Sequence, residues 1–208
     1  KGNVKDINSY YIVNGMAVTA TKEVAEKVAS FPEVEKVLPN ETRQLYTTKT
    51  EDALAPESVV ANVEWNVSRV KAHEVWAMGI DGSGTVVASI DTGVQWDHPA
   101  LKEKYRGYNA STGQADHDFN WFDATAGKAT PYDDLGHGTH VTGTMVGSET
   151  NGSNQVGVAP GAKFISVKAF AANGGTDVDL LEAAQWILAP TDSEGNARVD
   201  MAPDVVNN

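Results

Sequence analysis

The chain has 208 residues, of which 41% are hydrophobic and 21% charged, so a packed core is expected in one large domain or in a small domain joined to part of a larger one. A formal net charge of -12 repels phosphate backbones and excludes nucleic acid as an expected partner. The chain contains no cysteine, which excludes disulfide frameworks, thiolate nucleophiles and cysteine-ligated zinc, and no apolar run is long enough to cross a bilayer.

Both ends of the chain indicate a piece of a longer protein. It starts at Lys1 rather than at a methionine and shows no signal peptide. Its last residues, 204–208, have the pattern of a strand that is cut short. We therefore expect truncation at both ends.

The first segment predicts a small β-α-β unit. Residues 9–19 are rich in Tyr, Ile and Val around an Asn-Gly pair, which predicts two short strands or one bent strand. Thr21 is a candidate N-cap for a helix that runs to Ser30, and residues 34–38 predict a returning strand. A unit of roughly 45 residues is near the lower limit for independent folding, so we expect it to pack on a partner surface.

After this unit the periodicity is lost and then changes. Residues 42–61 follow neither a helical nor a strand period, and we interpret them as a linker. Beyond it, strands are predicted at 85–90, 163–169 and 205–206, and helices at 72–78, at 137–146 and after Thr176. A polar stretch rich in Gly and Asp, residues 97–134, separates the first strand from the second helix. Alternation of this kind predicts an open, mostly parallel α/β sheet.

Asp91 directly follows the predicted strand 85–90. In open parallel sheets, functional groups gather at the carboxyl ends of the strands. A structural role is also open, in which the carboxylate accepts hydrogen bonds from the following backbone in a turn. A charge beside a buried strand needs a partner in either case.

His137 lies in the sequence GHGTHVTGT, residues 136–144. The flanking glycines let other groups approach the imidazole closely, and its small neighbours give it little apolar cover, which is unusual for a core histidine. One alternative is a hydrogen-bonded structural histidine at a helix start. Another is a metal site shared with His140, but zinc-protease helices space two histidines four apart with a glutamate between them, and that glutamate is absent.

An aspartate after a strand and a later, glycine-flanked histidine together indicate an orienting carboxylate and a general base. The histidine would take a proton from a nucleophile, and the aspartate would fix its tautomer. No serine or threonine of the chain lies in a Gly-x-Ser-x-Gly elbow or a Ser-Met-Ala-like helix start. We therefore expect the nucleophile outside this chain.

Two stretches resemble the catalytic motifs of the subtilisin-like serine proteases, the subtilases. TVVASIDTGVQWDHPAL (85–101) is similar to their Asp motif, HGTHVTGTMVG (137–147) is similar to their His motif, and subtilisin has the chain order Asp, His, Ser. The likeness runs from about Val63 to Asn208 and includes NQVGVAPGAKFISVKAF (154–170). Residues from Gly2 to about Tyr46 resemble the later part of the family's inhibitory propeptide.

This resemblance implies a fold and a division of the chain. The fold is α/β, the N-terminal portion of a subtilisin-like parallel sheet with flanking helices, preceded by part of a ferredoxin-like α+β propeptide. Residues 1–46 would be the propeptide part, which acts as inhibitor and chaperone. Residues 47–61 would be the linker or maturation region, and residues 62–208 the N-terminal part of the catalytic domain.

The resemblance also implies a function. The protein would be a secreted bacterial serine endopeptidase that forms an acyl-enzyme, with Asp91 and His137 as two members of the triad and the serine downstream. Gly174 and Gly175 fall where the family has an edge strand that pairs with substrate, although a plain turn before Thr176 is also open. The partners would be peptide substrates and the remaining part of the domain. The alternative is a catalytically incomplete fragment that only binds that remainder.

No cofactor is expected for catalysis, but the resemblance makes structural calcium an expectation. The family's strongest calcium site takes a carboxylate where this chain has Ala100. Oxygen ligands for calcium also occur in the loop 149–155 and in a cluster of acidic residues. The alternative explanation of that cluster is a solvated acidic loop that binds no metal. The cluster consists of Asp116, Asp118, Asp123, Asp133 and Asp134. The metal site is therefore left unassigned.

Overall fold

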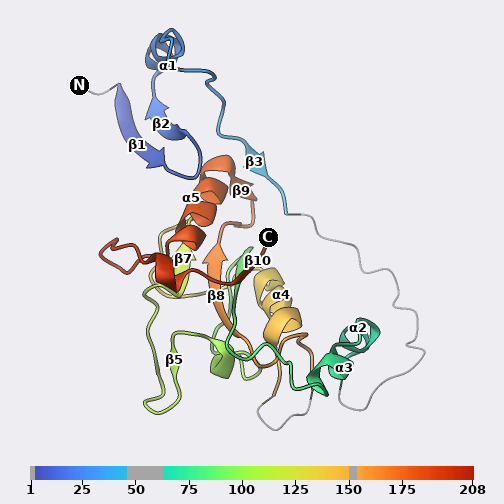
Figure 1. Ribbon diagram of the computed structural model, residues 1–208. Helices are drawn as coiled ribbons and strands as arrows, with labels where there is room; N and C mark the ends of the chain where they lie inside the picture. The colour runs from blue at the N-terminus through green and yellow to red at the C-terminus, as the bar shows by residue number, and fades with distance from the viewer. Residues whose placement is uncertain (1–2, 46–62, 150–153) are drawn as a thin grey trace.

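A four-stranded parallel sheet forms the centre of the molecule in the computed structural model, which describes residues 3–45, 63–149 and 154–208 (Figure 1). The strand order is β10-β4-β8-β7, and every pairing is parallel. The strands are β4 (Val86–Asp91), β7 (Trp121–Asp123), β8 (Lys163–Lys168) and β10 (Val205–Asn207). The predicted parallel α/β sheet is confirmed, and β7 is an additional strand that the sequence did not predict.

Two helices cover opposite faces of this sheet. On one face, α5 (Asp177–Leu188) packs Ala183, Trp186 and Ile187 against alternate residues of β4 and β8. On the other face, α4 (His137–Val146) contributes Val146 to a cluster around Phe164 of β8. Because both faces are covered, β4 and β8 read as nearly continuous apolar runs in the sequence.

The beginning of α5 is determined by its own sequence. Thr176 accepts a hydrogen bond from the Asp179 backbone N–H, and the Asp179 carboxylate accepts one from the Thr176 N–H. This reciprocal capping box satisfies two N–H groups that a helix start leaves unpaired. The predicted cap at Thr176 is therefore confirmed.

The N-terminal segment is a hairpin followed by a helix. Strands β1 (Val4–Tyr10) and β2 (Gly15–Ala20) pair antiparallel, and α1 (Lys22–Ala29) follows with Thr21 at its N-cap. The predicted returning strand at 34–38 is wrong, since this backbone is irregular and exposes Leu38. A strand needs a hydrogen-bonded neighbour, and none lies beside these residues in the part of the chain that the structure describes.

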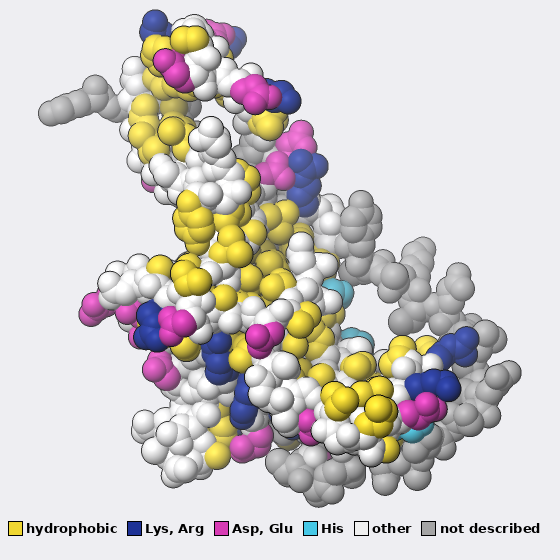
Figure 2. Space-filling model, viewed as in Figure 1, with side chains coloured by type: hydrophobic (Ala, Val, Ile, Leu, Met, Phe, Trp, Pro, Cys, Tyr) yellow, Lys and Arg dark blue, Asp and Glu magenta, His cyan; other side chains and the backbone are white. Residues whose placement is uncertain are grey.

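The hairpin rests on α5, as Figure 1 shows. Asn8 donates to Glu182 over 3.0 Å, and the backbone N–H and hydroxyl of Tyr11 each bond Gln185 over 2.7 Å. Tyr10, 7% exposed, closes the contact, and hydrophobic side chains continue across it in Figure 2. The expected partner surface of the first segment is thus α5.

Short elements complete the fold. The chain segment after α1 forms β3 (Thr42–Arg43), which pairs antiparallel with β9 (Gly175–Thr176). The other elements are α2 (Trp65–Arg69), α3 (Ala72–Trp76), the 3₁₀ turns η1 (Lys102–Lys104) and η2 (Val199–Met201), and the paired β5 (Tyr108–Asn109) and β6 (Gln114–Ala115). The region 42–61 therefore begins with a strand, and the rest of the predicted linker, 46–61, lies outside the described residues.

Candidate active site

Asp91 and His137 lie side by side, as expected from their positions in the sequence. Asp91 is the last residue of β4, and His137 is the first residue of α4. The imidazole Nδ1 is 2.7 Å from Asp91 Oδ1. The Asp91 side chain is 5% exposed and that of His137 is 35% exposed. A buried carboxylate therefore holds the inner ring nitrogen, and the ring itself reaches the surface.

A second layer of polar groups joins the two segments. Thr92 accepts a hydrogen bond from the Gly138 N–H over 2.9 Å and donates to Asp133 over 2.8 Å. Asp133 also accepts from the backbone N–H and hydroxyl of Thr139. Burial alone would raise the pKa of Asp133, but the hydrogen bonds from Thr139, Thr92 and Gly136 outweigh it and hold the pKa below its ordinary value. The start of α4 is thus fixed to the end of β4.

Gly138 explains how closely α4 approaches β4. A Cβ atom at this position would lie 2.1 Å from the Gly93 carbonyl oxygen and 3.1 Å from Asp91 Cβ. No side chain larger than hydrogen fits between them. The glycine after the histidine is therefore required by packing against the aspartate segment.

Lys168 is a buried cation at the centre of the site. It is 1% exposed, and its ammonium group donates to the Thr92 carbonyl (2.6 Å), the Phe170 carbonyl (3.0 Å) and Asp134 (2.7 Å). This hydrogen bond from Lys168 lowers the pKa of Asp134. The ammonium thereby ties together the segments that follow β4, precede α4 and follow β8.

Sequence reasoning missed Thr92, Asp133 and Lys168 as parts of the site. Asp133 was considered only as a calcium ligand, and Thr92 only as part of the backbone that follows Asp91. The signal for Lys168 was a lysine inside the apolar run KFISVKA, since a charged residue is rarely fully buried without a partner.

Gly174 and Gly175 lie at the edge that pairs with β3. Arg43 lies opposite Gly175 in the antiparallel register, and Thr42 lies opposite Thr176. A Cβ atom at Gly174 would meet the Arg43 carbonyl oxygen at 2.4 Å, so glycine permits the close approach of the paired strand. The edge is therefore built for a neighbouring extended backbone, and here the neighbour comes from the same chain.

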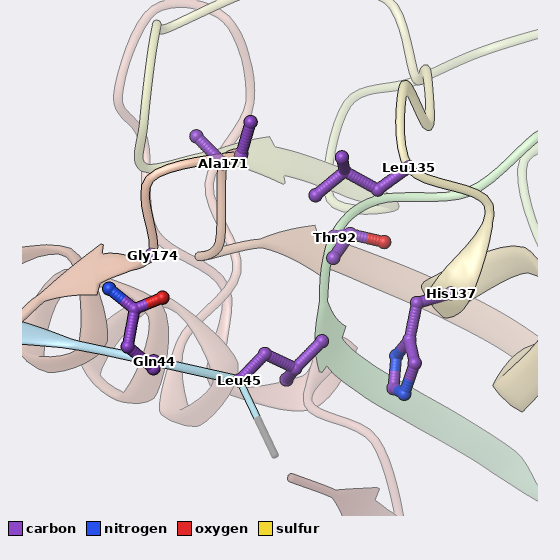
Figure 3. A pocket seen from close by; sticks show the side chains of 8 residues that line it. Gln44, Leu45, Thr92, Leu135, His137, Ala171 and Gly174 are labelled. Atoms are coloured by element: carbon purple, nitrogen blue, oxygen red, sulfur yellow. The ribbon is translucent and has the colours of Figure 1, made fainter. Parts of the chain in front are cut away.

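A cleft of about 370 Å³ separates this edge from His137. Gln44 and Leu45 enter it from the segment after β3, and His137 stands on the opposite side (Figure 3). The remaining lining residues are Thr92, Leu135, Ala171, Ala172 and Gly174. A chain segment that pairs with β9 is thus led directly toward the imidazole.

The residues considered for metal binding do not converge. His140 is exposed on α4, while the His137 Nδ1 faces Asp91. In the acidic cluster, Asp123 accepts hydrogen bonds from three backbone N–H groups, and Asp118 accepts one from the Ser193 N–H. The other two carboxylates have protein partners as well, Thr139 for Asp133 and Lys168 for Asp134. Within the described ranges no three His, Asp or Glu side chains are grouped so that they could hold a metal ion. The cluster does not fit a shared calcium, and part of the loop 149–155 lies outside the described residues.

Comparison with known families assigns the chain. The model of the subtilase family (Peptidase_S8) matches residues 82–208, which include Asp91 and His137. The chain belongs to the subtilase family. The model of the peptidase inhibitor I9 family matches residues 1–46. The resemblance to subtilases and to their propeptides is confirmed.

Two relatives carry the likeness over most of the chain. Bacillopeptidase F of Bacillus subtilis is 63% identical over all of this chain, which corresponds to 15% of that protein. The minor extracellular protease Vpr of the same organism is 29% identical over 84% of this chain and 21% of its own length. The chain therefore spans about a seventh to a fifth of the length of these relatives.

A solved structure shows the same fold. The epidermin leader peptide processing serine protease (EpiP, S393A mutant) from Staphylococcus aureus superposes with a TM-score of 0.63. The match covers 93% of this chain and 43% of that one at 19% sequence identity. It supports the predicted fold, a subtilase-like parallel sheet preceded by part of a propeptide.

Proposed function

We propose that this chain is the propeptide part and the N-terminal catalytic part of a serine endopeptidase, with Asp91 and His137 as two members of a triad. The observation that carries the proposal is the 2.7 Å contact between the buried Asp91 carboxylate and the His137 Nδ1. The third member is a serine downstream of Asn208. No serine hydroxyl among the described residues bonds His137.

The chemistry follows from this geometry. Asp91 accepts the Nδ1–H of His137, which leaves Nε2 as the free base and stabilises the imidazolium that forms later. His137 takes the serine proton as the hydroxyl oxygen attacks the peptide carbonyl, and returns it to the leaving amine. Water then adds to the acyl-enzyme with the same base, so that the carboxylic acid is released and the serine regenerated.

Gly174 and Gly175 would hold the substrate. An extended peptide that adds to the edge of β9 gains backbone hydrogen bonds without any side-chain requirement. The antiparallel pairing of β3 with β9 supports this, because a segment of the chain already occupies the edge in an extended conformation.

The first segment would act as inhibitor and folding aid until it is removed. Its hairpin rests on α5, its strand β3 occupies the edge of β9, and its last described residues line the cleft beside His137. Substrate and this segment therefore exclude each other. Cleavage within 47–61 would release it, with residues 62–208 remaining as catalytic part. We further propose secretion from a bacterium, in line with the relative named as an extracellular protease.

Fluorophosphonate labelling tests the proposal. A longer polypeptide that continues past Asn208 should take up the probe on its serine, and His137→Ala should lower turnover on the order of 10⁶-fold because the base is lost. His140→Ala, three residues further along the same helix and exposed, is the matched control and should leave turnover near normal. Near-normal turnover of the His137 variant would disprove the assignment.

A second role applies to the 208-residue chain by itself. The edge of the sheet at β10 exposes Val205 (59%) and Val206 (42%), and β4 is its only strand partner among the described residues. We propose that the isolated chain hydrolyses nothing and binds the rest of the domain at this edge. It should remain unlabelled alone, and the label should appear on the second polypeptide when the two are refolded together. Labelling of the isolated chain would contradict this role.

A further inference from the structure

One ion pair joins β3 to the start of α5. The Arg43 guanidinium donates from Nε to Asp177 Oδ1 over 2.7 Å and from Nη2 to Asp177 Oδ2 over 3.1 Å. Asp177 immediately follows β9 and is the first residue of α5. Acidic and basic side chains meet beside β3 in Figure 2.

The same carboxylate belongs to the strand-pairing geometry. The Asp177 N–H donates to the Glu41 carbonyl over 2.9 Å, and its Oδ2 accepts the Glu41 N–H over 3.3 Å. The neighbouring Val178 N–H donates to Asn40 Oδ1 over 3.0 Å. A backbone paired with β9 therefore carries the side chain opposite Gly175 to the Asp177 carboxylate.

The segment that docks on β9 and the start of α5, residues 40–45, makes uncharged contacts on the C-terminal side of Arg43. Gln44 donates to the Asn173 carbonyl, and Leu45 packs on the apolar cluster beneath α5. The second acid on Arg43, Glu41, belongs to the docked segment itself and bonds Nη2 over 2.9 Å. Among the described residues outside this segment, Asp177 is thus the charged group that pairs with Arg43.

We propose that Asp177 forms a subsite for an arginine side chain, so that the edge of β9 selects extended peptides with arginine opposite Gly175. A two-pronged contact matches the planar guanidinium and not the single ammonium of lysine. Two residues further along, the docked segment places Leu45 in the cleft beside His137. The favoured peptides therefore have, from the N-terminal side, an arginine, then any residue, then an apolar residue. This inference rests on the proposed function where it concerns cleavage, and on the chain alone where it concerns binding.

Amide hydrogen exchange on the 208-residue chain tests the subsite without any protease activity. The N–H groups of residues 177 and 178 bond the docked segment and report its release. Because the pair is partly exposed, at 52% for Arg43 and 35% for Asp177, we expect a moderate effect. Asp177→Asn and Arg43→Gln should each speed exchange about two- to fivefold, and the double variant should be no faster than either one, since both remove the same contact.

Two further variants sharpen this test. Arg43→Lys should fall between wild type and Arg43→Gln, because one of the two parallel hydrogen bonds is lost. Arg198→Gln is the matched control, since it breaks an exposed arginine–aspartate pair with Asp200 on another segment and should leave both amides unchanged. Unchanged exchange in both Asp177→Asn and Arg43→Gln would overturn the inference.

Peptide cleavage by the longer polypeptide tests selectivity separately. Peptides with arginine at this position should show about two- to fivefold higher kcat/KM than matched peptides with glutamine, and Asp177→Asn should reduce the ratio to near one. Asp177→Arg should reverse the ratio in favour of glutamine, and a third matched peptide with glutamate should then be cleaved best. Equal cleavage of both peptides by the wild type would overturn the inference while the protease assignment stands. If nothing is cleaved, the proposed function fails, and the exchange experiment still decides the subsite.

Discussion

The ammonium group of Lys168 lies where three segments of the candidate site meet. Its hydrogen bonds among the described residues do not include His137, yet it binds the Thr92 carbonyl next to Asp91 and the Phe170 carbonyl in the segment that leads to β9. We therefore expect the positions of His137 and of the β9 edge to depend on this one buried side chain.

Replacing this side chain tests that dependence. Lys168→Met keeps the length of the side chain but leaves two buried carbonyls without a donor, at about 1–2 kcal/mol each. We expect a loss of about 2–4 kcal/mol in the free energy of unfolding, measured by urea denaturation. Lys163→Met, at the exposed start of the same strand, is the control and should cost under about 1 kcal/mol. Equal effects of the two substitutions would show that Lys168 does not fasten the site.

Gly138 sets the distance between the two candidate catalytic residues. Gly138→Ala places a methyl group 2.1 Å from the Gly93 carbonyl oxygen, so α4 must move away from β4. We expect a loss of at least about 2 kcal/mol in stability and loss of the hydrogen-bonded Nδ1–H resonance of His137 in proton NMR. Gly143→Ala in the same helix has open space at Cβ and should keep that resonance while gaining up to about 1 kcal/mol. A retained resonance in Gly138→Ala would refute this packing argument.

At the scale of elements, α5 serves two surfaces. Its inner face packs on the sheet, and its outer face carries the N-terminal hairpin through Glu182 and Gln185. Burial, helped by Asp179 and Asp6, raises the pKa of Glu182, although hydrogen bonds from Asn8 and Tyr10 oppose this. Burial and the neighbouring Glu182 raise the pKa of Tyr10 to about 12. The hairpin is therefore docked onto a carboxylate whose ionisation is disfavoured.

This predicts a pH-dependent effect of one substitution. Since the folded pKa of Glu182 lies above the unfolded value, its ionised form costs folding free energy above the folded pKa and costs nothing below the unfolded one, about 4.3. Glu182→Gln keeps the acceptor oxygen for Asn8 and removes the charge. We expect a higher urea midpoint than wild type at pH 7 and equal midpoints near pH 3.5. The exposed control Glu33→Gln should show no difference at either pH, and a lower midpoint of Glu182→Gln at pH 7 would contradict the prediction.

At the scale of the whole molecule, the junction of β4 and α4 makes the free energy of unfolding depend on pH in the acidic range. Asp133 has a folded pKa below its ordinary value, so its contribution is present above the unfolded pKa, about 3.9, and is lost as the pH falls through the folded value. Asp133→Asn should cost about 2–4 kcal/mol at pH 7, because an amide cannot accept with both of its polar atoms. In urea unfolding from pH 7 down to 2.5, the difference from wild type should hold to about pH 5 and then shrink. Asp97→Asn, at an exposed position, is the control, and a gap that stays constant into acid would exclude this linkage.

The sequence alone was sufficient for three of the four strands of the sheet, β4, β8 and β10, and for singling out Asp91 and His137 as candidate catalytic residues. Strand β4, helix α4 and the cap of α5 are encoded by local patterns of apolar, small and capping residues, which act over a few positions. Asp91 directly follows a predicted strand, where functional groups gather in parallel sheets, and His137 lies at a glycine-flanked helix start. Each also had a structural alternative, so the resemblance to the subtilase motifs was needed to choose them.

Only the tertiary structure decided which distant segments meet. Strand β7 lies in a polar stretch and is a strand because β8 offers it a partner, whereas residues 34–38 have a strand-like composition and no partner beside them. Lys168 binds Thr92 across 76 positions, and Arg43 binds Asp177 across 134. Such contacts carry no short-range pattern, because a hydrogen bond depends on distance in space and a sequence records only order along the chain.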